Sequence, residues 1–484
     1  MNVILILLDT LRRDHIGCYG NPWIRTPHLD RLAAMGTRFT NAYCGSAPCM
    51  PARRELWTGR YEFPWRGWGP LEQDDPRLPL LLAQGRPPFG RPLEGSRRTM
   101  LITDHYHYWH FGAGNYHDGF AGYEFIRGQE HDPWQTDSTD MRPYPAPPQR
   151  LRSGIECHLR NTAHFRCEED YFAPQVFSRA MRWLERNARL GEFFLLVESF
   201  DPHEPWDPPY PYAEMYNPGY QGDCITFPHY GTADQMSPEE LCQMRALYAG
   251  EVTMVDRWLG LFLDKAEALG LLDNTCIIVA TDHGHMLGEH NTVGKPTGSL
   301  GELWQEMAHV PLVIYHPEIA RGVCDALVQT VDLLPTILEA AGVPLPPNLH
   351  GHSLLGLMRG QVSQVREYAF WAYFGHAVNV TDGRWVLFHW PTNEANRSLH
   401  WFSPLHPEFW QRQWPRERCG DHWLLHPAEG FCNPSQLYDL ATDYAQEHNV
   451  IARHPAEADR LRAAIAGFFE RVGAPQETRA RYGL

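Results

Sequence analysis

The chain has 484 residues, 43% hydrophobic and 21% charged, a composition that excludes a disordered or fibrous protein. Its formal net charge of −16 argues against nucleic acid or an anionic membrane as a partner. No apolar stretch reaches the length of a membrane span, so we expect a soluble, cytoplasmic protein. In that compartment its eleven cysteines, which lack paired spacing, are expected to be free thiols.

The first predicted element is a strand over residues 3–8. Its continuous apolar run is typical of a parallel strand buried on both faces. The strand delivers Asp9 and Thr10 to its carboxyl end, the edge at which open α/β sheets bind ligands. A short helix from Thr26 and a second strand over 37–42 follow.

A helix is predicted to begin near Cys49, because Pro51 suits a first helical turn. Unpaired N–H groups and the helix dipole favour negative charge at that end. Arg53 lies one turn further and can face the same spot, with a fork of donors suited to a tetrahedral oxyanion. These features suggest a nucleophile site, whereas the alternative for a lone cysteine is an inert, buried residue.

The next strand, over 98–102, ends at Thr103 and His105, and a long polar and aromatic loop follows to about residue 149. Ser237 begins a long helix that extends towards residue 269. The other elements predicted in this half are a helix over 173–187, strands over 193–197, 276–280 and 310–315, and a helix over 332–342.

The predicted secondary structure changes at about residue 367, where short strands joined by tight turns replace the alternation of strand and helix. The strands are predicted over 368–373, 377–381, 385–389 and 437–440, before a closing helix over 455–472. Alternating buried strands and helices predict an α/β fold with a mostly parallel sheet covered on both faces. We therefore expect a catalytic domain over 1–366 and a smaller α+β domain over 367–484.

Aromatic-rich tracts occur over 106–109, 206–212 and 401–423. Such tracts line pockets for ring-containing or sugar substrates, or they pack long loops onto the surface.

Asp9, Asp282 and His283 follow two different predicted strands at the edge where Cys49 also belongs. Carboxylate oxygens suit a hard divalent cation, and an added imidazole admits Mn²⁺ or Zn²⁺. Asp282 alone fits a simple turn residue equally well.

Two longer segments carry a family resemblance. Cys49-x-Pro51-x-Arg53, with Leu56-x-Thr58-Gly59-Arg60 after it, resembles the signature of type I, formylglycine-dependent sulfatases. This family belongs to the alkaline phosphatase superfamily and includes phosphonate monoester hydrolases and phosphodiesterases. The run from Asp282-His283-Gly284 to Gly294-Lys295 resembles its second signature. The resemblance implies an alkaline-phosphatase-like α/β/α sandwich with a smaller C-terminal domain.

The resemblance also implies a set of residue roles. Cys49 would be oxidised to formylglycine by a separate formylglycine-generating enzyme, and the hydrate of that aldehyde would be the nucleophile. One divalent ion, Ca²⁺ or Mn²⁺, would be held by Asp9, residue 49, Asp282 and His283. Arg53 and Lys295 would bind the substrate anion, and His203 would protonate the leaving oxygen.

The remaining implied roles are less determined. His105 would be the base that breaks down the covalent intermediate, although His107 and His110 are also placed at the rim. Thr103 replaces a lysine of the sulfatase pattern, and Thr10 replaces an acidic residue, so both are candidate substrate contacts.

The predicted function is hydrolysis of a small anionic sulfate ester. The alternative is phosphonate monoester or phosphodiester hydrolysis, towards which Thr10, Thr103 and an alanine at Ala52 lean. A more distant alternative is a non-catalytic metal-binding protein in which Cys49 stays a thiol. The sequence is compatible with a homo-oligomer.

Overall fold

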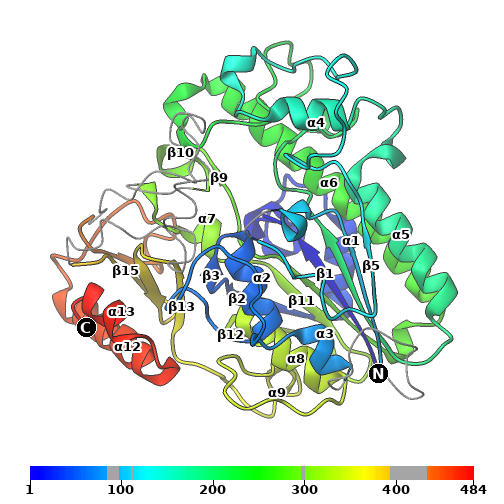
Figure 1. Ribbon diagram of the computed structural model, residues 1–484. Helices are drawn as coiled ribbons and strands as arrows, with labels where there is room; N and C mark the ends of the chain where they lie inside the picture. The colour runs from blue at the N-terminus through cyan, green and yellow to red at the C-terminus, as the bar shows by residue number, and fades with distance from the viewer. Residues whose placement is uncertain (84–96, 111–112, 296–299, 393–432) are drawn as a thin grey trace.

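A mixed eight-stranded sheet forms the centre of the molecule (Figure 1). The computed structural model describes residues 1–83, 97–110, 113–295, 300–392 and 433–484. The strand order is β12-β2-β11-β8-β1-β6-β4-β5. In chain order the strands are β1 (Asn2–Leu8), β2 (Thr37–Tyr43), β4 (Arg98–Thr103), β5 (Gly122–Phe125), β6 (Phe193–Ser199), β8 (Thr275–Ala280), β11 (Leu312–Tyr315) and β12 (Gly322–Gln329).

The central strand β1 is buried on both faces, as its apolar run predicts. It runs parallel to β6 and β8, and every residue of the three strands is buried. Alternate side chains of β1 enter two different cores, because successive residues of a strand point to opposite faces. The helices of one core are α1 (Pro27–Met35), α5 (Phe172–Asn187) and α6 (Pro238–Ala268), and those of the other are α2 (Cys49–Thr58), α3 (Leu78–Leu82) and α8 (Leu333–Ala340). The predicted α/β/α sandwich is confirmed.

The long helix α6 begins where the sequence predicts. Ser237 is its N-cap: the Glu240 N–H donates to Ser237 Oγ at 3.3 Å, and the Ser237 N–H donates to the Glu240 carboxylate at 2.8 Å. This reciprocal pair satisfies two donors that the helix end would otherwise leave open.

One strand of the mostly parallel sheet runs in the opposite direction, and neither edge strand was predicted. The predicted strand over 310–315 appears as β11, and it runs antiparallel to β8 and β2. The sequence could not give this direction, because an apolar run carries no information on strand direction. The edge strands β5 and β12 were not predicted. Both are partly exposed and lack a continuous apolar run.

The last strand of the smaller C-terminal sheet comes from the N-terminal part of the chain. Its order is β16-β15-β14-β13-β3. The elements are β3 (Ser46–Ala47), β13 (Ala369–Tyr373), β14 (Val378–Thr381), β15 (Trp385–His389) and β16 (Gln436–Asp439), packed against α12 (Pro455–Val472), with α13 (Gln476–Arg481) beside it (Figure 1). Ser46 pairs in parallel with Ala372, and it lies three residues before Cys49, the first residue of α2. The pairing of β3 with β13 therefore holds in place the segment that leads into α2, the helix that carries Cys49.

A further small sheet consists of β7 (Gly231–Thr232), β10 (Thr292–Gly294) and β9 (Met286–Leu287). Lys295 directly follows its central strand, β10. Short helices α4 (Ile155–Asn161), α7 (Gln305–Ala308) and α9 (Leu355–Met358) complete the described elements. The aromatic tract over 401–423 lies outside the described residues.

The described cysteines are all free thiols, as predicted. In the described part of the chain, no helix combines the length and the apolar character needed to span a bilayer.

Candidate active site

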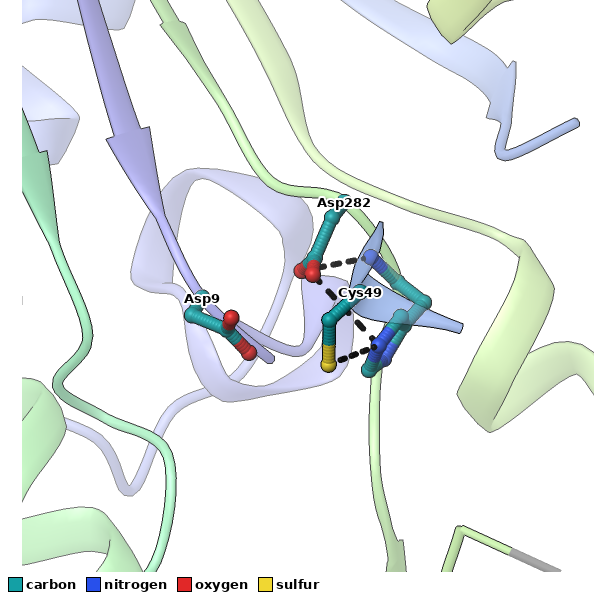
Figure 2. Close-up of side chains that lie close together, drawn as sticks. Asp9, Cys49 and Asp282 are labelled. Carbon is teal, nitrogen blue, oxygen red and sulfur yellow. Dashed lines mark hydrogen bonds and ion pairs between the residues drawn. The ribbon is translucent and has the colours of Figure 1, made fainter. Parts of the chain in front are cut away.

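Cys49 is the first residue of α2 and lies at the carboxyl edge of the central sheet (Figure 2). Asp9 directly follows β1, and Asp282 and His283 follow β8. The Cys49 sulfur lies 3.3 Å from His283 Nε2, and one donor atom from each of the four residues falls within 4.8 Å of the others. All four side chains are at least 97% buried. The structure thus brings the predicted metal ligands together.

The donor set fits a divalent cation. Two carboxylates and an imidazole suit a hard or borderline ion. Asp9 Oδ1 is buried and has no hydrogen-bond partner among the described residues. Burial, followed by the neighbouring charge of Asp282, raises the pKa of Asp9 well above its usual range. A bound cation would remove that cost, because it favours the ionised carboxylate.

Arg53 lies one turn after Cys49 and is only 1% exposed. Its guanidinium donates to Asp9 Oδ2 at 2.8 Å and to Asp282 Oδ2 at 2.5 Å. Its Nε donates to Glu198 Oε1 at 2.8 Å. Arg53 is therefore the cation that compensates three buried carboxylates near Cys49.

Glu198, near the end of β6, is a site residue that the sequence did not reveal. It accepts hydrogen bonds from Arg53, from Thr103 Oγ1 at 2.8 Å and from the Tyr108 hydroxyl at 2.8 Å. The only signal was an acidic residue inside an otherwise apolar strand. Thr103 also accepts a bond from the His105 N–H at 2.9 Å, so its hydroxyl is engaged by the protein.

His105 is fully buried beside the carboxylates, with Nε2 3.5 Å from Asp9 Oδ2. Neither ring nitrogen has a hydrogen-bond partner within the described chain. Burial, then the charge of Arg53, lowers the pKa of His105 well below its usual value. The ring is thus neutral and able to accept a proton.

Thr10 acts on the site through its backbone. Its N–H donates to Asp282 Oδ1 at 3.1 Å, and its carbonyl accepts from the Tyr248 hydroxyl at 2.8 Å. Its φ of 59° lies in the left-handed region, which costs a β-branched residue free energy and is concentrated at functional sites. Its hydroxyl is buried and has no hydrogen-bond partner among the described residues.

His203 and Lys295 form a direct pair. The Lys295 ammonium donates to His203 Nε2 at 2.7 Å, and His203 Nδ1 lies 2.5 Å from the Glu204 carbonyl oxygen. Burial lowers the pKa of His203 to about 4. Burial acts to lower the pKa of Lys295 as well, but Glu204 and Tyr230 together raise it well above its usual value. Lys295 is therefore charged and His203 neutral at neutral pH.

Two protein-family models match this chain. Residues 1–343 match the family model described as Sulfatase, and residues 301–395 match that described as N-sulphoglucosamine sulphohydrolase, C-terminal. An arylsulfatase of Clostridium perfringens is 26% identical over 411 residues, covering 76% of this chain and 80% of that protein.

Two solved structures share the fold. The phosphonate monoester hydrolase of Agrobacterium radiobacter superposes with a TM-score of 0.71 at 22% identity, covering 99% of this chain and 97% of that one. A protein solved with its substrate D-glucosamine-2-N,6-O-disulfate gives a TM-score of 0.69 at 17% identity, covering 99% of both chains. Since the Sulfatase model spans well over half of its length, the chain belongs to the sulfatase family.

Proposed function

We propose that this protein hydrolyses a small sulfate ester, with Cys49 converted to formylglycine and a divalent cation, Ca²⁺ or Mn²⁺, at the same site. The observation that carries the proposal is the convergence of Asp9, Cys49, Asp282 and His283 at the N-terminus of α2. Cys49 itself is a buried thiol, and burial is the main cause that raises its pKa well above its usual value. Because the thiol form is a poor nucleophile, a formylglycine-generating enzyme is needed as a partner to convert it.

The residues around Cys49 divide the chemistry among them. A cation held by Asp9, Asp282, His283 and residue 49 would supply Lewis acidity and positive charge. Formylglycine at position 49 would supply, as its hydrate, a hydroxyl that attacks sulfur as the oxyanion, and the new S–O bond would form as the bond to the leaving oxygen breaks. Arg53 and Lys295 stabilise the negative charge on the sulfate oxygens. His203, once protonated on Nε2, delivers that proton to the leaving oxygen.

Release of sulfate then needs a base. His105 takes the proton of the second hydroxyl on residue 49, the carbonyl reforms, and the bond between carbon and the sulfate oxygen breaks. The neutral, unpartnered His105 ring beside Asp9 supports this role. Thr103 acts through its bond to Glu198, and Thr10 acts through its bond to Asp282. Neither residue provides a charge that could contact the ester.

The second candidate function is hydrolysis of phosphonate monoesters or phosphodiesters. The observation that favours it is the neutral Thr103, which stands where the sulfatase pattern has a lysine and whose hydroxyl is bound to Glu198. The reaction would use the same residues on phosphorus, since these substrates carry the same single negative charge as a sulfate ester.

Matched nitrophenyl esters distinguish the two functions. With protein co-produced with the maturation enzyme, we expect kcat/KM to be highest for the sulfate, lower by roughly 10-fold or more for the phenylphosphonate and the phosphodiester. The measurement is initial rates over a range of substrate concentrations. A higher kcat/KM for either phosphorus ester would overturn the sulfatase assignment and favour the second candidate.

Metal removal should lower stability. A ligand present at 100 times its dissociation constant stabilises the folded state by about 2.7 kcal/mol, so chelation should lower the melting temperature by roughly 5 °C. Calorimetry with EDTA, Ca²⁺ or Mn²⁺ measures the shift. The variant Asp282→Asn, of the same shape, should lose the metal-dependent part. An identical melting temperature with and without chelator in the unsubstituted protein would contradict the metal site.

A further inference from the structure

Glu204 is the one acidic side chain in the described part of the chain that bonds to Lys295. Its side chain is fully buried, and both carboxylate oxygens lie 3.3 Å from Lys295 Nζ. Arg152 donates to Oε1 at 3.2 Å, and the Tyr230 hydroxyl donates to the same oxygen. His285 Nδ1 lies 3.5 Å from Oε2. Burial opposes ionisation, but His203 and Lys295 outweigh it and hold the pKa of Glu204 well below its usual value.

The Lys295 ammonium has no N–H left over in this arrangement. An ammonium has three donors. One goes to His203 Nε2 at 2.7 Å, one to the Tyr230 hydroxyl at 2.9 Å, and the third is shared between the two oxygens of Glu204. An incoming ester oxygen must therefore replace one of these partners.

Glu204 also fixes the ring of its neighbour His203. Because a carbonyl oxygen only accepts, the contact of His203 Nδ1 with the Glu204 carbonyl places the ring proton on Nδ1. Nε2 then carries a lone pair and accepts from Lys295. One residue thus holds both members of the pair, His203 through its backbone and Lys295 through its carboxylate.

We propose that Glu204 is the positioning residue of the Lys295–His203 pair, and this rests on the function proposed above for those two residues. Its carboxylate keeps the ammonium against His203 Nε2 until an ester anion arrives. When Lys295 turns one N–H to the anion, Nε2 loses this donor, takes up a proton from solvent and passes it to the leaving oxygen. Glu204 thereby links anion binding to protonation of the leaving group, and its charge also limits how strongly the site binds anions.

The variant Glu204→Gln tests the proposal on the full-length, matured protein. It removes the charge and keeps the size. We expect kcat for an alkyl sulfate, whose leaving oxygen needs a proton, to fall about 100-fold, and kcat for nitrophenyl sulfate to fall less than 10-fold. The dependence of kcat on leaving-group pKa therefore becomes steeper in the variant.

Glu130→Gln is the matched control. Glu130 accepts from the other nitrogen of Arg152, Nη2, at 3.1 Å and has no hydrogen bond to Lys295. If Glu204 acted only by holding Arg152, both variants would lose the same activity on both esters. That result, or a loss by Glu204→Gln that is equal for the two esters, would overturn the proposal.

Binding of inorganic sulfate, measured by calorimetry, provides a readout that does not require turnover. Removing a negative charge beside Lys295 should tighten sulfate binding by about 3-fold or more in Glu204→Gln, with no change in Glu130→Gln. Weaker or unchanged binding in Glu204→Gln would overturn the proposal. If matured, unsubstituted protein hydrolyses no ester, the proposed function fails, and the sulfate comparison alone decides whether Glu204 restrains Lys295.

Discussion

Replacing Cys49 with alanine should lower kcat/KM for every ester by roughly 10⁴-fold or more, because it removes the proposed nucleophile. The fold should persist, since the substitution deletes a single sulfur atom at the start of α2 and leaves the backbone hydrogen bonds of the helix intact. We expect the melting temperature to change by only a few degrees. Steady-state kinetics and calorimetry on the same preparation measure both effects.

Cys44→Ala is the control for this experiment. Cys44 is also fully buried, and its sulfur contacts the Met307 carbonyl oxygen at 4.0 Å rather than a predicted metal ligand. This variant should keep its activity and its modified Cys49. Mass spectrometry of the peptide that contains Cys49 should show an aldehyde in the active protein. An unmodified thiol in fully active protein, or substantial activity in Cys49→Ala, would contradict the formylglycine proposal. An unmodified thiol in inactive protein would favour a non-catalytic metal-binding protein.

The clustering of Asp9 and Asp282 at one edge of the sheet could be predicted from the sequence because both residues lie where buried strands end. Asp9 and Asp282 each follow a continuous apolar run, and the carboxyl ends of β1 and β8 meet at one edge because the strands are parallel neighbours. Cys49 and Arg53 share a face of α2 through helical periodicity. Local pattern and topology together were sufficient for these residues.

The supporting residues could not be predicted in the same way. Glu198 occupies a strand position that pattern analysis treats as core, and its partners Arg53 and Thr103 lie 145 and 95 residues away in sequence. Glu204 meets Arg152 and Lys295 across 52 and 91 residues. No periodicity relates such positions, so only the folded arrangement of the loops reveals these contacts. The edge strands β5 and β12 could not be predicted for a different reason: their exposure weakens the apolar pattern.

Replacing Arg53 with methionine should cost both stability and activity. The variant leaves Asp9, Asp282 and Glu198 buried without their shared cation, and breaking a buried ion pair in this way costs about 3–5 kcal/mol. In the proposed mechanism Arg53 also stabilises the transition state, so its loss should lower kcat/KM by roughly 10²–10³-fold. Chemical denaturation with EDTA present measures the change in the free energy of unfolding, and ester kinetics measure the second effect.

A divalent cation should offset part of this destabilisation, because it neutralises Asp9 and Asp282 directly. Added Ca²⁺ or Mn²⁺ should therefore raise the melting temperature of Arg53→Met by more than that of the unsubstituted protein. Arg54→Met is the matched control: Arg54 is equally buried, but it bonds to Glu62 and to the carbonyl oxygens of Gly67 and Pro70. Its loss should destabilise the fold without changing the response to metal. Equal metal responses in the two variants would show that Arg53 and the cation do not act on the same carboxylates.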